Sequence, residues 1–110
     1  MGQFEEIDTQ KAKELIDQGN ITIVDIRDTS SFEEGHIENA VSVNDTNIEE
    51  FVNSADKNQP VLCYCYMGFS SRNAAQYFKE QGFETVYSMT GGFTEWQRVN
   101  ENSGESFQEG

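Results

Sequence analysis

The sequence predicts an α/β protein in which a parallel sheet lies between two layers of helices. The run 21-ITIVDI-26 is apolar on both faces and rich in β-branched residues, and 60-PVLCYCY-66 is a second apolar run. Such runs are typical of strands that helices cover on both sides. Strand-like and helix-like segments alternate, which favours parallel strands joined by helical crossovers. The chain has 110 residues, so we expect one domain over residues 1–99 and a flexible acidic tail at 100–110.

Capping residues and hydrophobic periodicity set the expected elements. Residues 4–7 predict a short first strand. A helix capped by Asp8 or Thr9 follows it and ends at Gly19. The later elements are expected to be a strand at 21–26, a short helix at 31–40, a weak strand at 40–43, a helix at 47–54, a strand at 60–66, a helix at 71–81, a strand at 85–88 and a helix at 93–98.

Composition and charge exclude several classes of partner. The formal net charge is −13, and only seven residues are Lys or Arg. These few basic residues are scattered, whereas a nucleic-acid partner requires them in clusters, and an anionic membrane surface would repel the chain. No run approaches the ~18–20 apolar residues of a membrane span, and the N-terminus lacks a signal-peptide pattern. We therefore expect a cytoplasmic protein that binds neither nucleic acid nor membrane.

Both cysteines of the chain lie in the expected strand at 60–66. If Cys63 and Cys65 share one strand, their side chains are about 6.5–7 Å apart on the same face, whereas a disulfide needs β-carbons about 3.8 Å apart. Both are therefore expected to be thiols. Cys63 lies inside the strand and is predicted to be a core residue. Cys65 lies at the carboxyl end of the strand, where open parallel sheets bind their ligands.

The segment 65-CYMGFSSR-72 predicts a reactive cysteine at a turn from strand to helix. Gly68 permits the tight turn. Amides of the loop and of the first helical turn would then point at the sulfur and favour thiolate over thiol. Arg72 would add a positive charge nearby. A sulfur activated in this way is a nucleophile that needs no histidine base.

Such a loop would stabilise either a persulfide or a phosphoryl group on Cys65. Phosphatases that use cysteine carry a Cys-x5-Arg motif, but this chain has Ser71 at the arginine position, and Arg72 is one place too late. The spacing therefore weakens the phosphatase interpretation without excluding it. A zinc site of Cys63, Cys65 and His36 would lack a fourth ligand and the usual wider cysteine spacing. His36 is expected to be structural, and neither a metal nor an organic cofactor is expected.

Three segments, in this order, resemble the signatures of rhodanese domains. The run 24-VDIRDTSSFEEGHIENA-40 is similar to their Asp-x-Arg and Gly-His-Ile-x-x-Ala motifs, and 65-CYMGFSS-71 is similar to their active-site loop. The run 91-GGFTEW-96 is similar to their closing Gly-Gly-x-x-x-Trp motif. The resemblance extends from residue 4 to about residue 98 and is to single-domain bacterial members. It implies a three-layer α/β/α domain with a five-stranded parallel sheet in the order 1-5-4-2-3.

The resemblance also implies a thiosulfate sulfurtransferase. Cys65 would take the outer sulfur of thiosulfate, or of another sulfane-sulfur donor, release sulfite and hold a persulfide. Cyanide, a thiol, or a dithiol protein such as a thioredoxin-like protein would then accept the sulfur. The catalytic loop would be the six residues Cys65 to Ser70. The residues implied to bind the substrate are Tyr66, Met67, Gly68, Phe69, Ser70, Ser71 and Arg72.

By the same resemblance, a second set of residues belongs to the scaffold. Arg27 would be fixed by a carboxylate; the alternative is that it attracts the substrate as a steering cation. The scaffold residues implied are Asp25, Arg27, Gly35 and His36.

Three loop positions depart from the family pattern. Met67 and Phe69 stand where the loop of these single-domain members usually carries His and Asn, and Ser70 stands where many rhodaneses have a basic residue. The more apolar rim predicts weak capture of small anions and favours a protein or a larger thiol as the partner. Two alternatives stay open: a carrier that receives persulfide from another protein with little turnover, and a phosphatase or arsenate reductase on the same scaffold.

Overall fold

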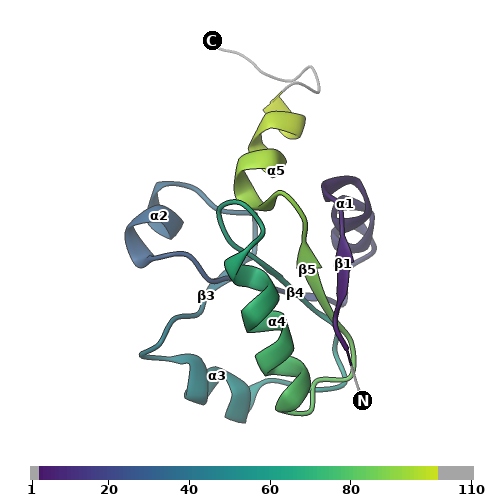
Figure 1. The fold of residues 1–110 in the computed structure, drawn as a ribbon, viewed down its shortest axis with the longest axis vertical. Helices are drawn as coiled ribbons and strands as arrows, with labels where there is room; N and C mark the ends of the chain where they lie inside the picture. Colours follow the sequence, from purple (N-terminus) through teal and green to yellow (C-terminus); the bar gives the residue numbers. More distant parts are fainter. Residues whose placement is uncertain (1–2, 102–110) are drawn as a thin grey trace.

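The structure, a computed structural model, describes residues 3–101 and contains one five-stranded sheet with helices on both faces (Figure 1). The strands are all parallel, in the order β1-β5-β4-β2-β3, which confirms the predicted fold class and strand order. The strands are β1 (Glu5–Ile7), β2 (Thr22–Asp25), β3 (Val41–Ser42), β4 (Val61–Tyr64) and β5 (Val86–Met89). The helices are α1 (Thr9–Gln18), α2 (Thr29–Glu34), α3 (Ile48–Ser54), α4 (Ser70–Glu80) and α5 (Gly92–Glu101).

Two clusters of buried side chains join the sheet to its two helical layers. On one face, Ala12 of α1 and Phe93 of α5 pack with Leu62 of the central strand β4. On the other face, Phe78 of α4 packs with Cys63, the next residue along β4. Successive residues of a strand point to opposite faces, and both of these β4 residues are fully buried. The apolar character of the central strands therefore reflects helices on both sides of the sheet, as predicted.

Capping side chains determine where the first two helices begin and end. The carboxylate of Asp8 caps α1, and Gly19, with a φ of 83°, ends it, so both predicted ends are confirmed. For α2 the prediction of a helix at 31–40 is wrong, because Asp28 caps the helix earlier and Gly35 ends it. The chain after α2 forms a loop that inserts buried side chains into the core, and its apolar residues produced the longer helical pattern.

The last helix is longer than the sequence predicts. A helix was expected at 93–98, whereas α5 begins at Gly92 and continues to Glu101. The first two residues of the expected tail therefore belong to a helix, and the rest of that tail, residues 102–110, lies outside the described residues. None of the helices in the described part of the chain has both the length and the apolar character that crossing a membrane requires.

A buried ion pair at the end of β2 connects three elements. The Arg27 guanidinium donates to both carboxylate oxygens of Asp25, at 2.7 Å from Nη2 to Oδ2. The same Nη2 donates to the carbonyl of Gly35 at the end of α2, at 2.6 Å. The guanidinium carbon also lies 4.2 Å from the ring centre of Phe93 in α5. Arg27 is thus held by a carboxylate, as the family resemblance implied.

We expect Asp25→Asn to lower the free energy of unfolding by about 3–5 kcal/mol, because it leaves the buried Arg27 charge without compensation. Urea denaturation would measure the loss. The matched control is Asp17→Asn, which breaks the exposed Lys13–Asp17 pair (3.4 Å; side chains 56% and 63% exposed) and should cost less than about 1 kcal/mol. Equal small effects of the two substitutions would contradict a structural role for the buried pair.

Candidate active site

The candidate active site is the loop, residues 65–69, that joins β4 to α4. Gly68 has a φ of 96°, a backbone conformation that residues other than glycine rarely adopt. A Cβ atom at this position would lie only 2.8 Å from the amide nitrogen of Gly91. Glycine is therefore required at residue 68 both by its backbone angle and by the close approach of the segment before α5.

The amides of this loop face the sulfur of Cys65. The N–H of Gly68 donates to Sγ at 3.2 Å, and the N–H of Ser71, in the first turn of α4, donates to it at 3.3 Å. Burial of the thiol opposes ionisation, but hydrogen bonds from the Ser71 side chain and from the amides of Ser71, Gly68 and Met67 outweigh it. The pKa of Cys65 is consequently lowered, and the predicted amide cradle is confirmed.

Cys63 has the opposite character, although it lies only two residues away. It is fully buried, and this burial raises its pKa far above the ordinary range of a thiol. Its sulfur donates to the carbonyl oxygens of Tyr87 at 3.4 Å and Ser71 at 3.6 Å. The predicted core role of Cys63 is confirmed, and Cys65 is the thiol available for chemistry.

The N-terminus of α5 holds the loop from behind. The amide of Phe93 donates to the carbonyl of Cys65 at 2.7 Å, and the amide of Thr94 donates to the carbonyl of Tyr66 at 3.0 Å. Gly92 has a φ of 61°, and a Cβ atom there would clash with both of these carbonyl oxygens. These two loop carbonyls are therefore paired with α5, while the amides of Gly68 and Ser71 donate to the sulfur.

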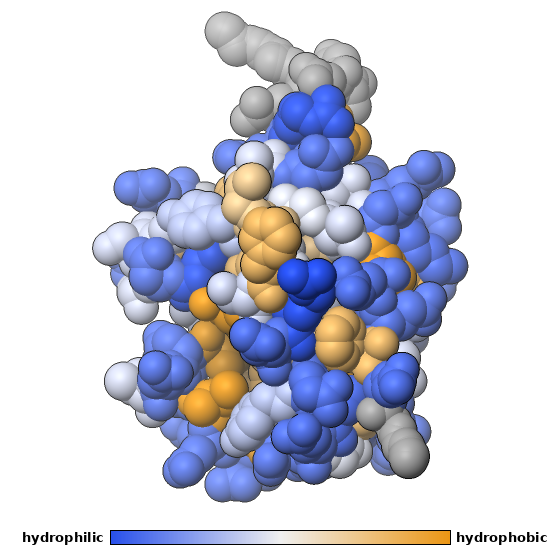
Figure 2. Space-filling model, viewed as in Figure 1, coloured by the Kyte–Doolittle hydropathy of each residue, from blue (hydrophilic) through white to orange (hydrophobic). Residues whose placement is uncertain are grey.

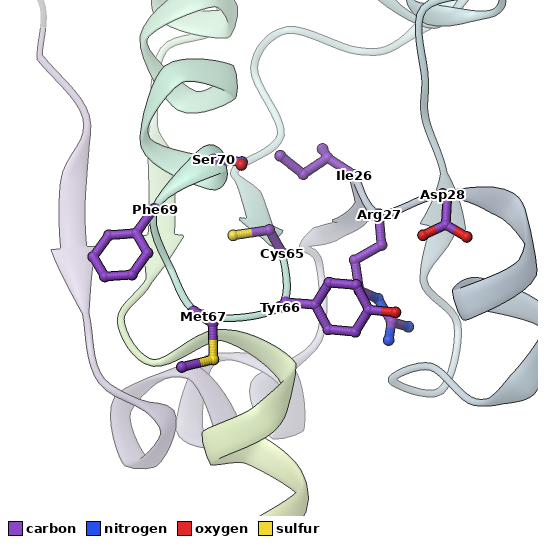
Figure 3. A pocket seen from close by; sticks show the side chains of 8 residues that line it. All are labelled: Ile26, Arg27, Asp28, Cys65, Tyr66, Met67, Phe69 and Ser70. Atoms are coloured by element: carbon purple, nitrogen blue, oxygen red, sulfur yellow. The ribbon is translucent and has the colours of Figure 1, made fainter.

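A pocket of about 220 Å³ opens in front of the sulfur. Only 6% of the Cys65 surface is exposed, yet Figure 3 shows its sulfur pointing into the space between Met67, Phe69 and Ser70. This opening offers a small anion a route to the sulfur. The pocket is lined by Ile26, Arg27, Asp28, Cys65, Tyr66, Met67, Phe69 and Ser70.

The rim of the pocket is apolar. Tyr66, Met67 and Phe69 are 49%, 55% and 66% exposed, and Figure 2 shows hydrophobic side chains on the face that carries this loop. Arg72 does not line the pocket. Its guanidinium carbon lies 5.3 Å from the ring centre of Phe69, so its charge covers the outside of the rim instead of the sulfur.

Comparison with known proteins agrees with this geometry. A family model described as the rhodanese-like domain matches residues 8–99, most of the chain. The chain belongs to the rhodanese-like domain family. The thiosulfate sulfurtransferase GlpE of Shewanella oneidensis is 42% identical to it over 100 residues, which are 91% of this chain and 99% of that protein. The thiosulfate sulfurtransferase GlpE of Coxiella burnetii is 45% identical over 94 residues, with 86% and 88% covered.

A solved structure is similar to the whole domain. The rhodanese-like domain of an Anabaena protein, determined by solution NMR, superposes with a TM-score of 0.78 at 21% identity and covers 96% of this chain and 87% of its own. At this identity the likeness is one of fold. The arrangement of strands and helices described above is thus the arrangement of a rhodanese-like domain.

Sequence reasoning missed part of the pocket of this rhodanese-like domain. Ile26 and Asp28, which follow β2, line the pocket beside Cys65 and were not predicted; Arg27, expected in the scaffold with a steering role as the alternative, lines it as well. A signal for them existed, because β2 and β4 are neighbours and the carboxyl ends of parallel strands meet at one edge. No sequence pattern predicts the hydrogen bond between the hydroxyls of Tyr66 and Ser31, because this bond depends on where α2 begins.

His36 lies outside the pocket of the rhodanese-like domain. Its Nδ1 is hydrogen-bonded to the carbonyl of Phe32 at 2.6 Å, and its ring stacks on the Phe32 ring with centres 3.8 Å apart. These contacts are those of a structural histidine, as predicted. Within residues 3–101, no three His, Cys, Asp or Glu side chains are grouped so that they could hold a metal ion.

We expect Gly92→Ala to slow the alkylation of Cys65 by iodoacetamide roughly tenfold or more, because the clash displaces the loop and its hydrogen bonds to the thiolate. The matched control is Gly19→Ala, which imposes a similar φ of 83° but has no atom within 4 Å of the added carbon. Both variants should lose about 1–3 kcal/mol of stability, because alanine rarely adopts a positive φ. A wild-type alkylation rate in Gly92→Ala would show that the contact with α5 does not position the loop.

Proposed function

We propose that this rhodanese-like domain is a thiosulfate sulfurtransferase that carries sulfur as a persulfide on Cys65. The observation that carries the proposal is the pair of amide hydrogen bonds, 3.2 and 3.3 Å long, that Gly68 and Ser71 donate to one sulfur. They stabilise a thiolate and would equally stabilise the negative charge of a persulfide. The GlpE relatives, named thiosulfate sulfurtransferases, support the same activity.

In the first step the thiolate of Cys65 attacks the outer sulfur of thiosulfate. A new S–S bond forms between Cys65 and that sulfur, while the S–S bond within thiosulfate breaks. The bonding electron pair leaves with the sulfite dianion, and the outer sulfur keeps its negative charge as the terminal sulfur of the persulfide. No proton is transferred in this step, which is consistent with a pocket whose lining includes no histidine.

In the second step a nucleophilic acceptor attacks the terminal sulfur of the persulfide. Cyanide would leave as thiocyanate, and the thiolate of a small thiol or of a thioredoxin-like dithiol protein would leave as a persulfide. In each case the Cys65–sulfur bond breaks and Cys65 recovers its thiolate. Neither step requires a metal or an organic cofactor, and the two-step scheme predicts ping-pong kinetics.

A second candidate is a carrier that receives persulfide from another protein and has little turnover with thiosulfate. The exposed apolar rim of Tyr66, Met67 and Phe69 favours it, because a protein partner can cover such a surface. The phosphatase alternative has less support, since Arg72 lies over the Phe69 ring and does not line the pocket. Arg72 therefore offers no guanidinium to a phosphoryl group on Cys65.

Treatment with thiosulfate should add one sulfur atom to Cys65, which intact-protein mass spectrometry would detect together with released sulfite. Cys65→Ser should abolish this gain and all sulfur transfer to cyanide. Cys63→Ser, the matched control at the buried thiol, should retain both. No added sulfur on the wild-type protein would contradict the enzyme and favour the carrier, provided that a persulfide donor protein can still load Cys65.

The rate of the reaction with thiosulfate should rise with salt concentration. The substrate is a dianion, the chain carries a net charge of −13, and the Arg27 charge beside the pocket is already paired with Asp25. Added salt screens the resulting repulsion. The control is the reaction of Cys65 with neutral iodoacetamide, which should depend little on salt. A thiosulfate rate that is flat or falls with salt would mean that the pocket attracts the anion.

A further inference from the structure

A pair of buried hydroxyl groups lies beneath the active-site loop. Ser88 belongs to β5 and Ser71 to the first turn of α4, and their Oγ atoms are 2.8 Å apart. Both residues are almost completely buried, with exposures of 1% and 0%. A buried hydroxyl is costly unless it is hydrogen-bonded, so this contact satisfies two polar groups in an otherwise apolar layer.

The surroundings of Ser88 decide the direction of this hydrogen bond. Among the described residues, Ser71 Oγ is the only hydrogen-bond partner of the Ser88 hydroxyl. Either hydroxyl can be the donor in this contact, but only donation by Ser88 gives the Ser88 proton an acceptor, and a buried hydroxyl without one would be destabilising. The Ser71 proton would then be free for another acceptor. The sulfur of Cys65 lies next to this residue, because the Ser71 amide donates to it at 3.3 Å.

We propose that Ser88 is a positioning residue for sulfur transfer, because its hydroxyl orients the Ser71 hydroxyl as a hydrogen-bond donor to the sulfur of Cys65. This inference rests on the proposed function and extends the amide cradle by one side-chain donor and the group that directs it. The Ser71 side chain is among the groups that lower the pKa of Cys65. Ser88 does not touch the substrate; its influence passes through Ser71 as a polarised chain of hydrogen bonds.

Other charged or titratable groups face Cys65 and must be held constant in any test. Arg27 and Asp28 line the same pocket from the end of β2, and Tyr66 lines it from the loop. Cys63 lies on the same strand and stays a thiol because it is buried. Arg72 in α4 lies on the rim over Phe69. None of these groups is changed by removing the hydroxyl of Ser88, so a change in Cys65 would report the hydroxyl chain.

The test is the pH dependence of Cys65 alkylation by iodoacetamide in the full-length protein. At a pH below the thiol's pKa the rate is proportional to the thiolate fraction. Loss of a donor to the thiolate disfavours the charged form and raises the pKa. Ser88→Ala should therefore shift the rate profile to higher pH and lower the rate on its acidic side roughly three- to tenfold, the effect of one hydrogen bond. An unshifted profile would overturn the proposal.

Two further variants make the test specific. Ser71→Ala should shift the profile in the same direction, and adding Ser88→Ala to it should shift the profile no further, because Ser88 acts through Ser71. A further shift in the double variant would overturn the proposal. Ser42→Ala is the matched control, since the Ser42 hydroxyl of β3 is buried without a partner and should leave the profile unchanged. Because alkylation does not involve thiosulfate, failure of the proposed enzyme activity would be seen separately.

Discussion

The hydrogen bonds from the start of α5 to the carbonyls of Cys65 and Tyr66 are the constraint on which the active site depends. A short loop carries as many carbonyls as amides, and it can direct its amides at one atom only if its carbonyls find donors elsewhere. The first amides of a helix have no partners within the helix and supply those donors. The two glycines at 91–92 allow the helix to begin close enough to the loop.

A strongly acidic protein can therefore contain a thiol that ionises easily. The amides that favour ionisation lie 3.2 and 3.3 Å from the sulfur, whereas most of the acidic side chains are exposed on the surface, where solvent and salt weaken their fields. The acid that lines the pocket, Asp28, accepts hydrogen bonds from the amide and hydroxyl of Ser31. The amide dipoles next to the sulfur thus affect the pKa of Cys65 more than the larger but more distant charge of the surface acids.

The fold was predictable from local patterns, but much of the site was not. Strands that are apolar on both faces, together with capping residues such as Asp8, predicted a sheet between two layers of helices. The strand order followed only from the family resemblance. The amide cradle around Cys65 was predictable because a strand, a glycine turn and a helix start occur together. The direction of Arg72 was not, because a long side chain in a first helical turn can point to the sulfur or outward. The contact between Ser71 and Ser88 joins two elements whose register no short pattern reveals.

Because the loop depends on Gly92 and Phe93, the arrangement of its amides around the sulfur can form only after these residues have been synthesised. Cys65 is synthesised before the residues that begin α5. Until the amide of Phe93 has been made and has docked on the Cys65 carbonyl, nothing holds the loop amides toward the sulfur, and the nascent chain carries an ordinary, mostly protonated thiol. The lowered pKa of Cys65 is thus a property of the nearly complete domain and not of the segment that carries the cysteine.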